Sequence, residues 1–145
     1  MAEMMDAVYK YEPKPGHMKF GQLPVPELGP NDVLVEIKAS GICGTDHSLY
    51  YWSEAIAKSY NITFPKIFGH EFAGVVAKIG SQVKGINVGD RVTVNPVLYC
   101  GRCPYCAEGI INVCDNRPFL GTDLDGGFAK YVKVREQNIV KLADN

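Results

Sequence analysis

The residues best suited to chemistry in this chain are four cysteines in the run CGRCPYCAEGIINVC. They are separated by gaps of two, two and seven residues: Cys100, Cys103, Cys106 and Cys114. Two C-x2-C steps that share a cysteine let three sulfurs converge from one tight loop, and the fourth follows after a short detour. Four converging thiolates form the closed tetrahedral shell that Zn²⁺ accepts as a structural site. The spacing therefore predicts a zinc-stabilised lobe.

Disulfide bonds and an iron–sulfur cluster are the competing interpretations of these cysteines. Disulfides suit a secreted chain, but the charged Glu3, Asp6 and Lys10 fall where the apolar core of a signal peptide would lie. Bacterial 4Fe–4S sequences also use two-residue gaps, but the C-x3-C-P continuation that commonly follows is absent here. Structural zinc is the favoured interpretation.

A fifth cysteine, Cys43, lies 57 residues before this cluster. It follows the run VLVEIKA (33–39), whose alternating pattern predicts a half-buried strand that ends in a turn at Gly41. A cysteine just beyond a strand end can present its sulfur to a cleft. A free cysteine is more often a small buried hydrophobic residue, and this segment alone favours that interpretation.

The short motif Gly69-His70-Glu71 lies at the start of another strand-like run, 72–79. An imidazole and a thiolate supply two zinc ligands, and a carboxylate is either a third ligand or a partner that orients the others. Taken alone, His70 is more often a hydrogen-bonded structural residue and Glu71 a solvated charge. Only the combination with Cys43 favours a second metal site.

Five short motifs in a fixed order resemble the zinc-dependent medium-chain alcohol and polyol dehydrogenases. They are G-I-C-G-T-D, G-H-E, G-D-R-V, the four-cysteine lobe and G-G-F-A-K-Y, at 41–46, 69–71, 89–92, 100–114 and 126–131. Each is weak evidence alone, but together they span nearly the whole chain. The resemblance, closest to the sorbitol and threonine dehydrogenase branch, implies a GroES-like catalytic domain with two zinc ions per chain, one catalytic and one structural.

The resemblance also implies roles for single residues. Cys43 and His70 match the family's catalytic zinc ligands, and Glu71 matches a carboxylate that binds the metal in polyol and threonine dehydrogenases. Thr45 matches the hydroxyl that bonds the substrate oxygen and passes its proton on, and Asp46 matches a residue that orients the metal ligands. In this family zinc lowers the pKa of an alcohol, which then gives hydride to the nicotinamide of NAD or NADP.

One departure from the family concerns the outer step of the proton relay. The branch that looks closest often has C-G-T-D-x-H, whereas this chain has C-G-T-D-H-S at 43–48. The histidine falls one position early, and Ser48 takes its place. The outer step is therefore assigned to His47 or Ser48, although an exposed loop histidine is the simpler interpretation of His47.

Length and composition indicate one compact domain. The 145 residues are 46% hydrophobic and carry a net charge of −1, which argues against disorder and against a nucleic-acid-binding surface. No apolar run approaches the ~20 residues that a membrane-spanning helix needs. The cytoplasm is the expected compartment, because thiols stay reduced there and can hold metal.

Strand signals dominate the elements that must position these residues. Strands are expected at 7–12, 33–39, 72–80, 91–95 and 128–134, and prolines restrict 19–30 to an edge strand or linker. Short helices are expected up to Tyr51, capped by Thr45 or Asp46, and over 53–60, capped by Ser53, with one helical turn within 104–109. The predicted fold is mainly β: a GroES-like, partly closed barrel with short helices and a zinc-stapled lobe.

No G-x-G-x-x-G run follows a strand, so no dinucleotide-binding unit is predicted within residues 1–145. In the family that the chain resembles, a Rossmann cofactor domain follows near this point. We therefore expect residues 1–145 to be the catalytic domain, inactive by itself, and the complete enzyme to be a homo-oligomer that oxidises a small-molecule alcohol. The short spacing of 11 residues between Cys114 and Gly126 favours a polyol, sugar or amino alcohol.

Two other classes of function explain part of the pattern. A non-enzymatic, zinc-stabilised GroES-like binding module accounts for the cysteine lobe but not for Cys43, Thr45, His70 and Glu71 at matching positions. A thiol redox sensor needs exposed cysteines of low pKa rather than a saturated four-sulfur site. Two metals per chain would indicate the dehydrogenase, and one metal per chain would indicate the binding module. An oxidised chain that holds no metal would indicate the redox sensor.

Overall fold

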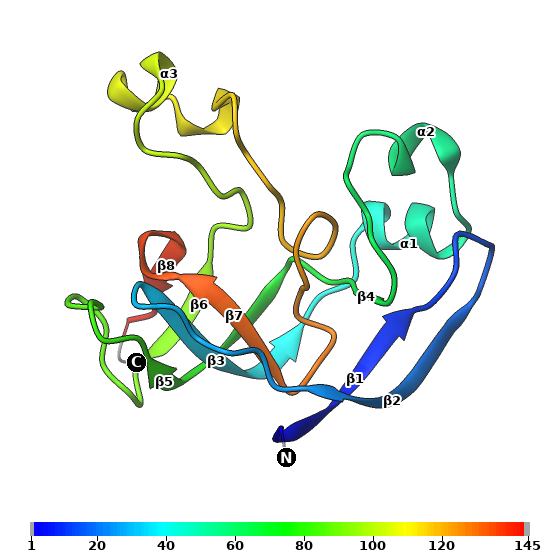
Figure 1. Cartoon of the computed structure of the whole chain (residues 1–145), viewed down its shortest axis with the longest axis horizontal. Helices are drawn as coiled ribbons and strands as arrows, with labels where there is room; N and C mark the ends of the chain where they lie inside the picture. The colour runs from blue at the N-terminus through cyan, green and yellow to red at the C-terminus, as the bar shows by residue number, and fades with distance from the viewer. Residues whose placement is uncertain (1, 144–145) are drawn as a thin grey trace.

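The computed structural model describes residues 2–143 and arranges them in two antiparallel sheets (Figure 1). The smaller sheet has the order β2-β1-β4, and its strands are β1 (Met4–Lys10), β2 (Met18–Pro24) and β4 (Lys66–Ile67). The larger sheet has the order β7-β3-β5-β6-β8, and its strands are β3 (Asp32–Ser40), β5 (Phe72–Ile79), β6 (Arg91–Val94), β7 (Tyr131–Arg135) and β8 (Ile139–Lys141). The prediction of a mainly β domain is confirmed. The short strands β4 and β8 were not predicted from the sequence.

The two sheets meet at the segment that leads into β7. The backbone N–H of Val8 in β1 donates to the carbonyl of Phe128 at 2.7 Å, and the N–H of Lys130 donates to the carbonyl of Asp6 at 2.9 Å. These bonds continue the larger sheet around a corner into the smaller one. The result is a partly closed barrel, as the sequence predicted.

The core is centred on β3, which lies between β5 and β7. Val33, Leu34 and Val35 are each at most 2% exposed, so the start of the strand is covered on both faces. The prediction of a half-buried strand was wrong there, because alternation cannot show that a second layer covers the outer face. The other end of β3 is exposed, and Ser40 pairs with Phe72 at the start of β5. This register brings the segments after β3 and before β5 together.

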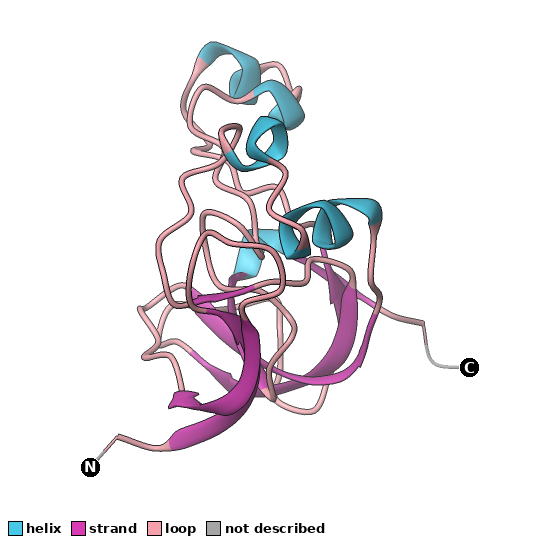
Figure 2. Cartoon of the chain, turned by 90° about the vertical axis from the view of Figure 1, so that its right-hand side faces the viewer, coloured by secondary structure: helices cyan, strands magenta, loops and turns pink. Residues whose placement is uncertain are grey.

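The helices gather at one end of the molecule and the strands at the other (Figure 2). After β3 come α1 (Gly44–Tyr50) and α2 (Glu54–Ala57); the projecting cysteine lobe holds α3 (Pro104–Ala107) and the 3-10 turn η1 (Ile111–Val113), and η2 (Glu136–Asn138) precedes β8. Ser53 is the N-cap of α2 as predicted, although its side chain makes no capping bond. Among the described residues no helix is both long and apolar enough to cross a membrane.

Candidate metal centres

Cys43 is the N-cap of α1 and lies three residues beyond the end of β3. Its sulfur accepts a hydrogen bond from the backbone N–H of Thr45 at 3.2 Å. The sequence had favoured Thr45 or Asp46 as the cap, and that prediction was wrong because a sulfur occupies the position that a hydroxyl or carboxylate usually fills. The Cys43 sulfur is therefore held at a fixed place at the start of the helix.

Asp46 connects the two segments that meet at this end of the barrel. Its side chain is only 4% exposed; Oδ2 accepts the N–H of Cys43 at 3.0 Å and Oδ1 accepts the N–H of Gly69 at 3.2 Å. Cys43 and Asp46 thus form a capping box with a cysteine in the place of serine or threonine. Each hydrogen bond to a charged group contributes about 1.5–3 kcal/mol, so Asp46 fixes the spacing of the two loops.

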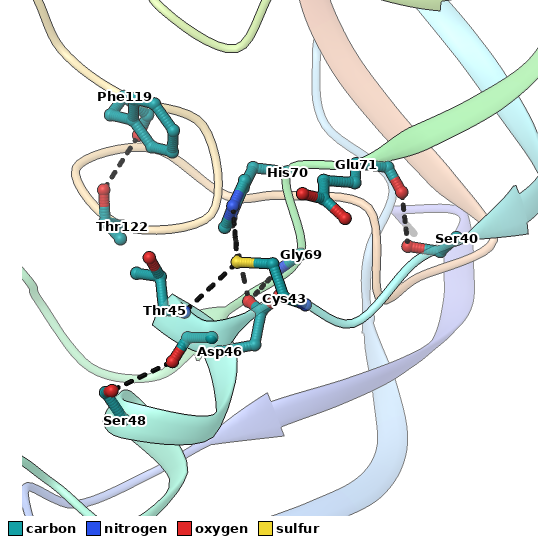
Figure 3. Close-up of polar contacts among 11 residues, drawn as sticks. Ser40, Cys43, Thr45, Asp46, Ser48, Gly69, His70, Glu71, Phe119 and Thr122 are labelled. Atoms are coloured by element: carbon teal, nitrogen blue, oxygen red, sulfur yellow. Dashed lines mark hydrogen bonds and ion pairs between the residues drawn. The ribbon is translucent and has the colours of Figure 1, made fainter.

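His70 lies between β4 and β5 and directs its ring at Cys43 (Figure 3). Its Nε2 is 2.9 Å from Cys43 Sγ, and its Nδ1 is 3.8 Å from Asp46 Oδ1. Ligand atoms of Cys43, Asp46 and His70 all lie within 4.8 Å of one another. The buried Nδ1 has no hydrogen-bond partner among the described residues. A thiol and an imidazole whose other nitrogen faces a carboxylate form a donor set that fits zinc.

Two glycines allow the backbone to bend tightly behind His70. Gly69 has φ +89°, and a Cβ at this position would lie 2.5 Å from the ring of Phe128. A Cβ at Gly126 would lie 2.0 Å from the carbonyl oxygen of Gly69. The N–H of Gly127 donates to that same carbonyl at 2.8 Å. The G-G-F run therefore packs directly against the segment that presents His70.

Glu71 is exposed and lies outside this cluster of three. Its Oε2 is close to Gly41, where a Cβ would be only 3.0 Å from it. Glu71 and His70 line an open cleft of about 730 Å³ together with residues at the ends of β3, β5 and β6. The structure therefore brings Cys43 and His70 together and leaves Glu71 beside them on the wall of the cleft.

The three residues assigned to the proton relay all lie in α1. Thr45 is in the first turn, next to the Cys43 sulfur. His47 is exposed, and its ring centroid is 4.9 Å from that of Tyr51. The Ser48 hydroxyl donates to the carbonyl of Gly44 at 2.9 Å, one turn back in the helix.

The second cluster contains the four cysteines of the lobe, whose sulfur atoms all lie within 4.8 Å of one another. The sulfurs of Cys103 and Cys114 are 3.8 Å apart. That is about the separation of two thiolates in a tetrahedral zinc site with ~2.3 Å bonds, and far more than the ~2.05 Å of a disulfide. The donor set and its spacing fit a structural zinc ion.

Backbone N–H groups of the lobe favour thiolates at two of the four positions. Hydrogen bonds from the Arg102 and Cys103 amides lower the pKa of the Cys100 thiol to about 6. A hydrogen bond from the Cys106 amide lowers the pKa of Cys103, whereas desolvation raises the pKa of Cys106 to about 12. The loop thus supplies part of the stabilisation that a bound cation would complete.

Sequence reasoning did not predict that Phe119 packs against His70. Its ring centroid is 5.0 Å from that of His70, in an edge-to-face arrangement. No short motif connects the two residues, which the fold brings together from separate loops. The Cys43–Asp46 capping box did leave a signal, because the spacing of three residues matches that motif.

Known proteins with the same architecture match most of the chain. The family of alcohol dehydrogenase GroES-like domains matches residues 29–144. The L-threonine 3-dehydrogenase of Symbiobacterium thermophilum is 44% identical over 139 residues, which are 96% of this chain and 39% of that protein. The chain spans about two-fifths of the length of the curated relatives that it matches.

Solved structures of dehydrogenases also align with most of the chain. Galactitol-1-phosphate dehydrogenase from Escherichia coli aligns with a TM-score of 0.84 at 32% identity, over 96% of this chain and 38% of that one. A cobalt- and zinc-bound thermostable alcohol dehydrogenase from Pyrobaculum aerophilum aligns with a TM-score of 0.86 at 31% identity, over 99% of this chain and 43% of that one.

Proposed function

This chain belongs to the family of alcohol dehydrogenase GroES-like domains, and on that premise we propose that it is the catalytic-domain portion of a zinc-dependent NAD(P) dehydrogenase. Its substrate would be a secondary alcohol, a polyol, a sugar or an amino alcohol. The observation that carries the proposal is the cluster of Cys43, Asp46 and His70 beside an open cleft. A binding module that needed only the cysteine lobe would have no use for this second cluster.

Cys43 and His70 would hold the catalytic metal, and the four cysteines of the lobe would hold the structural one. A bound zinc supplies Lewis acidity, which lowers the pKa of an alcohol. Glu71 is the proposed third ligand, since its carboxylate lies beside His70 on the wall of the cleft. Asp46 is less suitable for that role, because both of its oxygens already accept backbone hydrogen bonds.

The remaining residues position groups or move a proton. Asp46 keeps the Cys43 and Gly69 segments together, so the two metal ligands stay in place when a substrate enters. The Thr45 hydroxyl would bond the substrate oxygen and take its proton. His47 is the better candidate for the outer step, because its exposed ring can exchange protons with water, whereas the Ser48 hydroxyl already donates to Gly44.

The hydride acceptor would be NAD or NADP, bound by a Rossmann domain that completes the site. The relatives are more than twice as long as the region they share with this chain, which leaves ample length for such a domain. The complete enzyme would be a homo-oligomer in the cytoplasm, where reduced thiols can hold zinc.

A fusion experiment tests this function. We expect the zinc-loaded 145-residue chain to produce no reduced nicotinamide from NAD⁺ or NADP⁺ with a panel of polyols, amino alcohols and simple alcohols. L-threonine heads the panel because of the relatives that carry its name. Holding the nicotinamide near the substrate supplies ~7–11 kcal/mol of the barrier, and no dinucleotide-binding run is present in the sequence to do so. Fusion to the cofactor domain of the Symbiobacterium relative should give turnover.

The control is the same fusion with Cys43→Ser, which should fold but remain inactive. Saturable turnover by the unfused chain would contradict the need for a second domain. A folded, zinc-loaded fusion that binds NAD(P) and oxidises nothing in the panel would contradict the dehydrogenase itself.

A further inference from the structure

The carboxylate of Asp123 holds together two segments that are distant in the sequence. Its Oδ2 accepts the backbone N–H of Phe119 at 2.9 Å, within the same tight loop. Its Oδ1 accepts the backbone N–H of Asn61 at 2.7 Å, 62 residues away in the loop between α2 and β4. Hydrogen bonds to a carboxylate are short and strong. Asp123 therefore fixes the backbone of both loops at once.

Each of these loops contributes an aromatic ring to a row that ends at His70. The Phe119 ring is 5.0 Å from the His70 ring, centroid to centroid, and the two planes make an angle of 64°. The ring of Tyr60, the residue before Asn61, is 5.9 Å from that of Phe119. The Phe119–His70 contact is edge-to-face, an arrangement that aromatic rings prefer. The carboxylate of Asp123 thus anchors a row of three rings that ends at His70. Figure 3 shows the last two of these rings, Phe119 and His70.

His70 depends on such packing because only one of its two nitrogens has a polar contact within hydrogen-bond range. Nε2 is 2.9 Å from Cys43 Sγ. The buried Nδ1 has no hydrogen-bond partner in residues 2–143, and the Asp46 Oδ1 atom, at 3.8 Å, is too far away to be one. A ring with a polar contact at one nitrogen can turn about that contact. The ring of Phe119, packed against that of His70, opposes this turn.

We propose that Asp123 is a positioning residue for the metal ligand His70. Acting through Phe119, its carboxylate keeps Nε2 of His70 directed at Cys43 Sγ, so that the site is assembled before a metal arrives. This inference rests on the proposed function only in taking His70 as a ligand. The contact between the rings is independent of any metal.

Three variants test the proposal. Asp123→Ala removes both hydrogen bonds, and Asp123→Asn keeps one acceptor oxygen for them. Asp125→Ala is the matched control: it removes a carboxylate from the same loop, together with a hydrogen bond from the N–H of Ile67 at 3.2 Å, but leaves the Phe119 backbone untouched.

Two measurements on the 145-residue chain with zinc in the lobe give the result. The first is the chemical shift of the His70 ring protons, which the neighbouring Phe119 ring displaces. The second is the affinity of the Cys43–His70 site for cobalt, read from its visible absorption. We expect Asp123→Ala to lose the Phe119-dependent shift and to bind cobalt about 10-fold more weakly. Asp123→Asn should give a shift and a cobalt affinity between those of Asp123→Ala and the unmodified chain. Asp125→Ala should match the unmodified chain in both measurements.

Unchanged His70 shifts and cobalt affinity in Asp123→Ala would overturn the proposal. If that variant does not fold, Phe119→Leu removes the ring while keeping the Asp123 loop. Cobalt affinity alone is then the test, because the ring that displaces the His70 shifts is gone, and it should fall about 10-fold. Unchanged cobalt affinity would again overturn the proposal. Failure of the proposed function is a separate result. The unmodified chain would then bind no cobalt at Cys43 and His70, while the His70 shifts would still report the effect of Asp123.

Discussion

The two candidate metal centres of this chain are built in opposite ways. The lobe takes all four sulfurs from one segment, 100–114, in which only Cys114 is buried. The other centre takes Cys43 and His70 from segments 27 residues apart, at the ends of two paired strands. Asp46 and His70 in that centre are 5% and 9% exposed. On the proposed assignment the lobe would depend on its metal for structure, whereas the fold already brings the residues of the other centre together.

This difference follows from where the apolar core lies. The main core cluster is formed by the strands of the larger sheet and by residues such as Leu98 and Leu120, outside the lobe. A segment without a core of its own needs a cross-link, and four thiolates on one zinc ion would provide it. The other centre already has its backbone hydrogen bonds in place, so a metal bound there would be free to serve chemistry. A centre that needs its metal for stability and a centre that the fold assembles should therefore respond differently to mutation and to metal removal.

The largest effect is expected from removing one ligand of the lobe. Cys103→Ser should cost at least about 3 kcal/mol of stability, or roughly 10 °C in Tm, because a four-sulfur site cannot lose a ligand without loosening the loop. Cys43→Ser should weaken metal binding at the open site but leave Tm near its original value. Thermal unfolding with metal analysis checks both. A larger loss of stability in Cys43→Ser would make Cys43 a core residue and contradict its role as a ligand.

A smaller effect is expected from disturbing the scaffold of the open centre. Gly126→Ala places a methyl group 2.0 Å from the Gly69 carbonyl oxygen, which should cost about 1–3 kcal/mol and displace His70. Gly44→Ala is the matched control, because a Cβ there has nothing within 4 Å and its φ is not positive. Denaturant unfolding and cobalt binding should separate the two variants. Equal stability would mean that the G-G-F run does not support His70.

Local features of the structure could be predicted from the sequence. The lobe, its helical turn at 104–107 and its converging sulfurs follow from spacing within 15 residues, 100–114. The main strands of the barrel follow from their apolar patterns. The family, inferred from five motifs in order, is confirmed by the match over residues 29–144.

Features that depend on distant contacts could not be predicted. The cap of α1 is a local feature that was predicted wrongly for another reason: capping preferences rank hydroxyl and carboxylate groups first, whereas the cap is the sulfur of Cys43. The packing of Phe119 against His70 needs the tertiary fold. The roles of Glu71, His47 and Ser48 stay predictions, since they concern a metal and a substrate that would enter a preformed cleft.

The smallest expected change in stability comes from mild chelation of the zinc-loaded chain. A chelator can attach to a metal that has an open coordination position and draw it out, but it finds no such position on an ion enclosed by four thiolates. We therefore expect about one metal per chain to leave, with Tm and the circular dichroism spectrum almost unchanged, because hydrogen bonds to Asp46 still hold the emptied centre. A thiol-modifying reagent should then release the second metal and lower Tm. Cys43→Ser, which keeps only the lobe, should lose almost nothing to the same chelator. Simultaneous loss of both metals with unfolding would show that the two centres do not differ in the way proposed.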